Sequence, residues 1–390
     1  MSIRVLFVDD EQSILDALRT RFRRQRREWD IRVALGGEAA LEELARTPAD
    51  VVVSDMRMPG MDGAEFLARV KALYPASVRI VLSGHADNEA VIRALPVSHQ
   101  YLSKPCNADQ LVAVVDRTYG LQRYLADPAI RALAAGIGHL PTAPQTYVDL
   151  EAATHRSVDP KSIAVIVERD PALVARVLQI ANSAYLDIDR EVVSVPEAVR
   201  LLGFDFIKGL ALREQVTTTL QLDADDAAIA KVYTHSIQTA RIARALAEGR
   251  RIVDGAFTTA IVHDVGALVL ARACGARWQD VRRQAEADGR PLHEAELEAF
   301  GAHHASVGAY LLGMWGLPLS VVEATAYHHT LHLASETARP LLACLHVADA
   351  ISESDGRAGG ADDLQVDTTF LATCGIEPDP VRWRAQADAA

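Results

Sequence analysis

Five polar side chains follow β-branched apolar runs in the first 105 residues. Asp9 and Asp10 follow the first run, Asp55 the third, Ser83 the fourth and Lys104 the fifth. In an open parallel sheet the carboxyl ends of the strands form the edge where ligands bind, so these side chains are expected to lie together. Clustered carboxylates suit a hard cation such as Mg²⁺, which also offsets the charge of a phosphoryl group arriving on a carboxylate. Lys104 would add positive charge, and Ser83 would donate to a phosphoryl oxygen.

A second set of polar residues lies on the apolar faces of helical patterns between residues 229 and 349. This set contains His235, His263, with Asp264 beside it, His304, His328 and Asp349. A single inward histidine is usually a hydrogen-bonded core residue. However, an unpartnered buried polar group costs about 1–3 kcal/mol, so five helices are unlikely to bear that cost independently. We expect one shared polar site. Histidine with aspartate suits Zn²⁺, Fe²⁺ or Mn²⁺, and metal-bound water can attack a phosphoester.

The first set requires an α/β domain over residues 1–122. Strands are predicted at 3–9, 30–35, 50–55, 78–83 and 99–104. Helices are predicted at 13–22, 37–45, 63–73, 88–95 and 108–125. Five strand–helix alternations of this size predict a doubly wound, five-stranded parallel sheet.

The second set requires an all-α region. After about residue 123 the strand pattern disappears, and Asp127, Asp159 and Asp170 each precede a proline, as helix N-caps do. We predict a helical linker at 123–138, a helical domain at 139–350, and a loop with a helical tail at 351–390. Leu121 and Leu125 continue an apolar stripe beyond the sheet, which predicts contact with the second domain or with a partner, including a second copy in a homodimer.

The composition is that of a soluble globular protein with two or three domains. The chain has 390 residues, a formal net charge of −12 and 24% charged residues. This acidic balance, without a basic recognition helix, argues against nucleic-acid binding, which depends on phosphate neutralisation. The N-terminal apolar run is too short for a signal peptide, and no stretch approaches about 20 uninterrupted apolar residues. We expect a cytoplasmic protein without membrane contact.

The first third resembles the receiver domain of two-component response regulators. The resemblance rests on VDDE (8–11), SDMRMPGMDG (54–63), LSGHAD (82–87) and YLSKP (101–105). It implies that Asp55 accepts a phosphoryl group from a sensor histidine kinase or a phosphotransfer protein.

The same resemblance implies roles for the residues around Asp55. Asp10, Asp55 and the backbone carbonyl of Arg57 would bind Mg²⁺, with Asp9 assisting. Ser83 and Tyr101 take the positions of the switch pair that reports phosphorylation.

The helical region resembles an HDOD domain, a relative of the HD phosphohydrolases in which hydrolysis is generally absent or unproven. The resemblance rests on residues 169–185, 195–212, 257–270 and 303–318. It implies a signalling output domain. The residues His235, His263, Asp264, His304, His328, His329 and Asp349 are similar to the fuller HD ligand set. They define a candidate second metal site for Fe, Mn or Zn.

Two departures from the active relatives bear on catalysis. The cyclic-di-GMP phosphodiesterases of the HD-GYP family carry lysine after HDxG, where this chain has Ala267, and no GYP segment follows HVADAI (346–351). The predicted function is therefore a phosphorylation-controlled response regulator whose HDOD domain is a mainly non-catalytic, protein-binding output. The alternative is a metal-dependent phosphodiesterase acting on a cyclic dinucleotide such as cyclic-di-GMP, so whether the chain is an enzyme stays open.

Overall fold

The computed structural model spans the 390 residues. It describes all of them except 1, 85–92, 105–107, 122–123, 126, 155–158, 184–185, 187–189, 220–225, 355–363 and 390. The chain divides into two compact units, which are described separately. One contains Met1–His139, Gln179–Arg190 and Gly313–Gly316, and the other contains Leu140–Leu178, Glu191–Leu312 and Leu317–Ala390.

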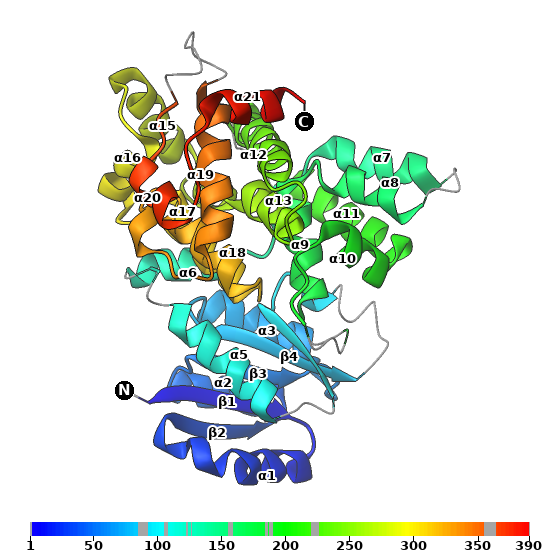
Figure 1. Cartoon of the computed structure of the whole chain (residues 1–390). Helices are drawn as coiled ribbons and strands as arrows, with labels where there is room; N and C mark the ends of the chain where they lie inside the picture. The colour runs from blue at the N-terminus through cyan, green and yellow to red at the C-terminus, as the bar shows by residue number, and fades with distance from the viewer. Residues whose placement is uncertain are drawn as a thin grey trace. The chain divides into compact units, whose positions relative to one another are not determined.

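The first unit is built on a five-stranded parallel sheet (Figure 1). Its strands are β1 (Ile3–Asp9), β2 (Trp29–Leu35), β3 (Val51–Asp55), β4 (Val78–Gly84) and β5 (Gln100–Lys104), in the order β2-β1-β3-β4-β5. The α/β prediction and all five strands are confirmed. Every residue of β3 is buried, as expected for a central parallel strand covered on both faces. The chain places β2 on one side of β1 and then places β3 on the other side. The carboxyl ends of β1 and β3 therefore lie side by side at the point where the strand order switches.

The helices of this unit follow the strands as predicted, with one correction. They are α1 (Gln12–Arg21), the 3₁₀ helix η1 (Phe22–Arg27), α2 (Gly37–Arg46), α3 (Gly63–Leu73) and α5 (Ala108–Gly120). The prediction that the last helix continues to Leu125 was wrong, because α5 ends at Gly120, a poor helix former. The helix predicted at 88–95 falls mostly outside the described residues. Helix α6 (Pro128–Gly136) lies in the predicted linker.

The second unit is all-helical, as predicted. Its helices are α7 (Pro144–Thr154), α8 (Pro160–Val167), α9 (Pro171–Ala181), α10 (Val195–Leu202), α11 (Phe204–Thr219), α12 (Asp226–Leu246), α13 (Val253–Val262), α14 (Val265–Cys274), α15 (Ala276–Asp288), α16 (Leu292–Phe300), α17 (His304–Met314), α18 (Leu319–Tyr327), the 3₁₀ helix η4 (Leu331–Leu333), α19 (Arg339–Ser354), α20 (Thr368–Thr373) and α21 (Pro380–Asp388). Helix α19 ends at Ser354, so it occupies the first four residues of the segment 351–390, where we expected a loop to begin.

The predicted N-caps are confirmed. Asp127 and Asp159 accept hydrogen bonds from backbone N–H groups in the first turns of α6 and α8. Asp170 caps α9 through Leu173 N–H and also accepts from Ala143 N–H. Burial raises the pKa of Asp170 to about 6. This carboxylate therefore ties the start of α7 to the start of α9.

Close packing of the helices positions the residues of the second set. Helix α12 packs on α13 and α19, and α18 packs on both α13 and α19. A Cβ atom on Gly266 would lie 1.9 Å from the backbone oxygen of His304, so only glycine allows α14 and α17 this approach. The contact places Asp264, at the start of α14, beside His304, at the start of α17.

The stretch Val253–Cys274 is long and apolar enough to pass a length and hydropathy test for a membrane span. It contains α13, the pair His263–Asp264 and α14, and 83% of its most apolar window is buried inside the protein. A core helix of a soluble protein passes the same test, so the stretch is weak evidence for a membrane span.

Candidate functional site

The carboxyl ends of β1, β3 and β5 bring three predicted residues of the first set together. The ammonium group of Lys104 lies 2.9 Å from Asp9 Oδ2 and also pairs with Asp55 Oδ1. The backbone N–H of Arg57 donates to Asp55 Oδ2 at 2.8 Å. Two carboxylates thus face one cationic group, and this geometry fits the expectation of a cation-binding edge.

The electrostatics of this edge follow from burial. Burial raises the pKa of Asp55, and the Lys104 ammonium group opposes that rise. For Lys104 itself, burial alone would lower the pKa, but hydrogen bonds with Asp55 and Asp9 outweigh it and raise the pKa. Lys104 therefore stays charged and stabilises the ionised form of Asp55, which is the nucleophilic form.

The other predicted residues of this edge are less closely joined. Asp10 is exposed, whereas Tyr101 is buried on β5. Ser83 belongs to β4 and pairs in register with Ser103, and its side chain lies outside the description. Among the described residues, Asp9, Asp10 and Asp55 do not form a set of oxygens within 4.8 Å of one another. The roles of Asp10, Ser83, Tyr101 and the Arg57 carbonyl remain predictions.

In the helical unit, His235, His263, Asp264 and Asp349 form a compact donor group. His235 Nε2 lies 2.9 Å from Asp349 Oδ1 and 3.3 Å from His263 Nε2. His263 Nε2 lies 3.4 Å from Asp264 Oδ1. The ligand atoms of His235, His263 and Asp264 lie within 4.8 Å of one another, close enough to bind one metal ion.

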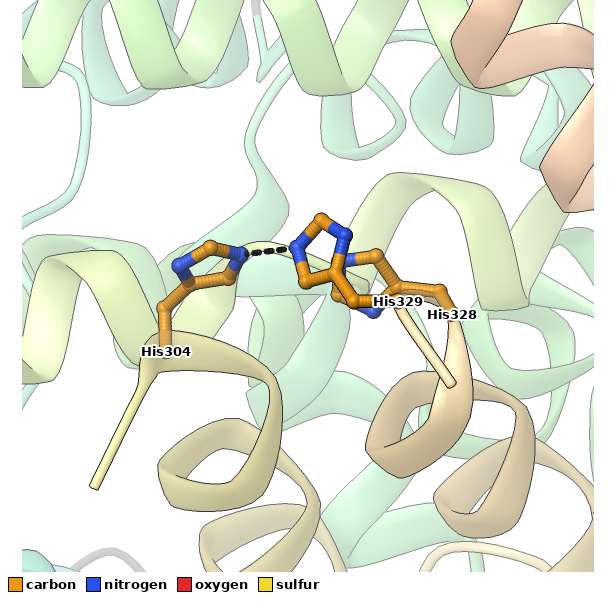
Figure 2. A group of neighbouring side chains, drawn as sticks. All are labelled: His304, His328 and His329. Carbon is orange, nitrogen blue, oxygen red and sulfur yellow. Dashed lines mark hydrogen bonds between the residues drawn. The ribbon is translucent and has the colours of Figure 1, made fainter. Parts of the chain in front are cut away.

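A second donor group contains His304, His328 and His329, whose ligand atoms also lie within 4.8 Å of one another. Figure 2 shows the rings of His304 and His329 facing each other, with His328 next to His329. The Nε2 atoms of His304 and His329 are 2.8 Å apart. Asp264 faces this group too, because its Oδ1 lies 3.4 Å from His304 Nε2 and 3.8 Å from His328 Nε2. The carboxylate of Asp264 is therefore shared by both donor groups.

Four of these histidines are anchored through Nδ1, which leaves Nε2 to face the shared carboxylate. The Nδ1 atoms of His263 and His328 lie 2.6 and 2.8 Å from the carbonyl oxygens of Ala260 and Thr325. His304 Nδ1 lies 2.6 Å from Glu296 Oε2, and His235 Nδ1 lies 3.2 Å from the hydroxyl of Ser352. Metal-ligating histidines are held in this way by a carbonyl or carboxylate on the second ring nitrogen.

The donor atoms fit a divalent cation in a further respect. His328 Nε2 is buried, and among the described residues it has no hydrogen-bond partner. An orphaned imidazole nitrogen in the core costs free energy, which a bound cation would recover. Mixed imidazole and carboxylate ligands suit Zn²⁺, Fe²⁺ or Mn²⁺.

Protonated histidines offset negative charge in the site when no metal is bound. Burial alone would lower the pKa of His235 and of His304, but Asp349 and Glu296 respectively outweigh it and raise each pKa to about 9. Burial lowers the pKa of His328 to about 3 and also lowers that of His329. Two charged imidazoles thus offset part of the charge of the three carboxylates Asp264, Asp349 and Glu296, and a metal ion would displace protons from the nitrogens that it binds.

The structure differs from the sequence prediction in its helix boundaries at this site. His263 follows the last residue of α13 and Asp264 precedes α14, so the pair occupies a helix junction rather than the middle of one helix. Four residues of this region were not predicted from the sequence: Glu296 and Ser352, which anchor the candidate ligands, and His293 and His303 beside them. The doubled histidine at 303–304 was the only sequence signal for any of these four.

Replacing Glu296 with glutamine is expected to weaken metal binding by about 10–100-fold, the usual effect of removing a partner that orients a ligand. Glu296 is fully buried and accepts from His304 N–H and Trp278 Nε1–H, both at 2.8 Å. An amide would set one N–H group against these donors. Isothermal titration with Mn²⁺ measures the effect. Glu298→Gln, at an exposed acid of the same helix that pairs with Arg290, is the matched control and is expected to leave metal affinity intact. Equal affinities of Glu296→Gln and wild type would contradict the anchoring role.

Two family models match this chain. The response regulator receiver domain matches residues 5–116, and the HDOD domain matches residues 140–331. The chain is a response regulator with an HDOD domain. Receiver domains generally bind Mg²⁺ and HD domains bind divalent metals, and a receiver domain implies a phosphodonor such as a histidine kinase.

The HDOD response regulator is similar to proteins of known structure. The MmoQ response regulator of Methylococcus capsulatus is 24% identical, with 64% of this chain and 98% of that chain covered and a TM-score of 0.51. A virulence factor of Campylobacter jejuni is 19% identical, with 70% and 96% covered and a TM-score of 0.52. At these identities the similarity shows the fold alone.

Among curated proteins, the hydrogenase transcriptional regulatory protein HoxA of Cupriavidus necator is 37% identical over 125 residues. That match covers 32% of this chain and 25% of the relative. The chain spans less than half the length of the first curated relatives that it matches. The similarity to HoxA thus has the length of a receiver domain.

Proposed function

We propose that phosphorylation of Asp55 controls the HDOD domain, whose output is the binding of a protein partner in the cytoplasm. A sensor histidine kinase or phosphotransfer protein would supply the phosphoryl group. Asp9, Asp10, Asp55 and the Arg57 carbonyl would hold Mg²⁺, which offsets charge during phosphoryl transfer. Lys104 would add positive charge beside the phosphoryl group, and Ser83 and Tyr101 would report the modification.

The observation that carries the non-catalytic reading is that, among the described residues, no lysine or arginine pairs with the carboxylates of the HDOD donor set. Ala267 stands where active relatives have lysine, and it is itself only 3% exposed. Within the described residues, every ion pair of Asp264 and Asp349 is with a histidine. No Lys or Arg in these pairs could stabilise negative charge developing on a phosphoryl oxygen, the interaction on which phosphoester hydrolysis depends most.

We propose that the donor set still binds Fe, Mn or Zn. Its ligands would be His235, His263, Asp264, His304, His328 and Asp349, with His329 as a further donor. A bound ion would activate water, and in this domain its main effect would be to stabilise the helical core around α13, α14, α17 and α19. Ions that bind only the folded state add stability in proportion to the logarithm of their concentration.

The second candidate function is hydrolysis of a cyclic dinucleotide such as cyclic-di-GMP. It is favoured by Asp264, whose carboxylate faces both donor groups, since two adjacent metal ions can clamp a phosphoester between them.

We predict that the metal-loaded protein does not hydrolyse cyclic-di-GMP at a useful rate. The assay uses the full chain loaded with Mn²⁺, Fe²⁺ or Zn²⁺, with product separation by chromatography. Asp264→Asn serves as the control for contaminating activity. Turnover above about 1 per second, which is typical of working enzymes, would establish the phosphodiesterase and reject the non-catalytic output. This turnover must depend on metal and be lost in Asp264→Asn.

A further inference from the structure

Three histidines lie in and beside the second donor group, and two of them, His293 and His303, take no part in the function proposed above. The ring centres of His293, His303 and His329 are 4.0 Å (293 to 329), 6.1 Å (293 to 303) and 6.4 Å (303 to 329) apart. His293 lies on α16, His303 directly precedes α17 and His329 follows α18. Three separate segments thus bring their imidazoles to one place, and all three residues are partly exposed.

His329 differs from the four anchored histidines of the inner set. In the described part of the chain its Nδ1 makes no recorded hydrogen bond, and its ring is stacked on that of His293 with an interplanar angle of 13°. The inner ion would retain Asp264, His304 and His328 without it, and three protein ligands are enough for a zinc-type site. His329 is therefore free to serve a ligand on its outer side.

His303 supplies a second sign of an unmet ligand requirement. Its Nδ1 is buried and lacks a hydrogen-bond partner among the described residues. Its backbone is fixed, because the backbone N–H faces the hydroxyl of Ser306 and that hydroxyl donates to the His303 carbonyl at 2.8 Å. An imidazole nitrogen held in the interior without a partner is the kind of group that a metal ion satisfies.

We propose that His293, His303 and His329 form an outer site for a late first-row divalent cation of the Zn²⁺ class. Imidazoles on one tetrahedral zinc, with Zn–N bonds of about 2.0–2.1 Å, have ring centres about 5 Å apart. The three observed ring separations bracket that value. The donor nitrogens do not lie within 4.8 Å of one another in this arrangement, so binding an ion requires the side chains to rotate. The site contains imidazole and no carboxylate, which selects Zn²⁺, Cu²⁺ or Ni²⁺ over Mn²⁺ and Mg²⁺. The inner set, with two aspartates, accepts Mn²⁺ as well.

The experiment counts metal ions per protein. Chelator-stripped full-length protein is dialysed to equilibrium against Zn²⁺ or, separately, Mn²⁺, and bound metal is measured by atomic emission. The variant is the double substitution His293→Gln and His303→Gln, which leaves His329 in place. His332→Gln, at an exposed histidine on η4, controls for adventitious surface binding. Thermal unfolding in EDTA checks the fold.

The double variant is expected to bind one Zn²⁺ fewer than wild type and the same number of Mn²⁺, while His332→Gln matches wild type with both. Equal Zn²⁺ counts in the double variant and wild type would overturn the outer site. The proposal would also be overturned if His332→Gln lost as much Zn²⁺ as the double variant, or if the double variant lost Mn²⁺ together with Zn²⁺. If the double variant does not fold, His293→Gln alone is measured, and it should weaken one Zn²⁺ site at least about 10-fold, with unchanged affinity overturning the proposal.

The outer site and the inner site are tested independently of each other. Asp264→Asn should lose the inner ions and keep one Zn²⁺ on the outer site. If wild type binds inner ions and the double variant loses none, only the outer site is wrong. If Zn²⁺ binding depends on His293 and His303 but not on Asp264, the outer site holds and the inner metal proposal fails.

Discussion

Asp264→Asn is expected to lower the affinity of the HDOD domain for Mn²⁺ by about 100-fold or more. The carboxylate of Asp264 is shared, with Oδ1 at 3.4 Å from both His263 Nε2 and His304 Nε2. Burial alone would raise its pKa, but the neighbouring imidazoles outweigh burial and hold the pKa well below the usual range, so the native group is an anion. A neutral amide removes a charged ligand from both donor groups at once, which exceeds the 10–100-fold effect of a residue that only orients a ligand.

Two measurements test this expectation. Equilibrium dialysis gives the affinity directly. Thermal unfolding with and without EDTA gives a second readout, because an ion at 100 times its Kd stabilises wild type by about 2.7 kcal/mol and should stabilise the variant far less. Asp280→Asn, an exposed acid paired with Arg283, is the matched control and should behave as wild type. Undiminished Mn²⁺ binding by Asp264→Asn would reject the inner metal site.

Asp55→Asn is expected to abolish phosphorylation of the receiver domain. Asp55 ends β3, pairs with Lys104 and is held by the Arg57 N–H, so its carboxylate is both oriented and kept ionised. An amide at this position is not a nucleophile. Incubation with acetyl phosphate and Mg²⁺, followed by intact mass, should add one phosphoryl group to wild type and none to the variant. Asp16→Asn, an exposed acid on α1, should be modified like wild type. A modified Asp55→Asn would mean that another residue is the acceptor.

The consequence of phosphorylation is tested with the same pair of proteins. Beryllofluoride, which mimics the phosphorylated aspartate, should change the solution scattering of wild type through a new domain arrangement or homodimer. The profile of Asp55→Asn should not change. Identical wild-type profiles at several concentrations would count against control of the HDOD domain by this route.

The sequence by itself determined most of the fold and the membership of both donor sets. Alternation of β-branched runs with helical patterns located all five strands, because burial on both faces of a parallel sheet leaves a local signal. Polar residues at strand ends identified Asp9, Asp55 and Lys104, because parallel topology brings those ends to one edge. Inward histidines on separate helices identified the second set, because buried polar groups need partners.

Tertiary structure alone decided how these residues meet. Periodicity shows which face of a helix is buried and leaves open which other face it packs against. The close approach of α14 to α17 at Gly266 places the carboxylate of Asp264 beside both donor groups, and no local sequence pattern encodes that contact. Glu296 is eight residues from His304, and its sequence context is that of any acidic residue in a helix. Packing of α16 against α15 buries it beside His304. His293, His303 and His329 come from three segments, and only packing brings their rings together. Local sequence patterns thus identified the candidate ligand residues, whereas the geometry of those residues depended on contacts between distant segments.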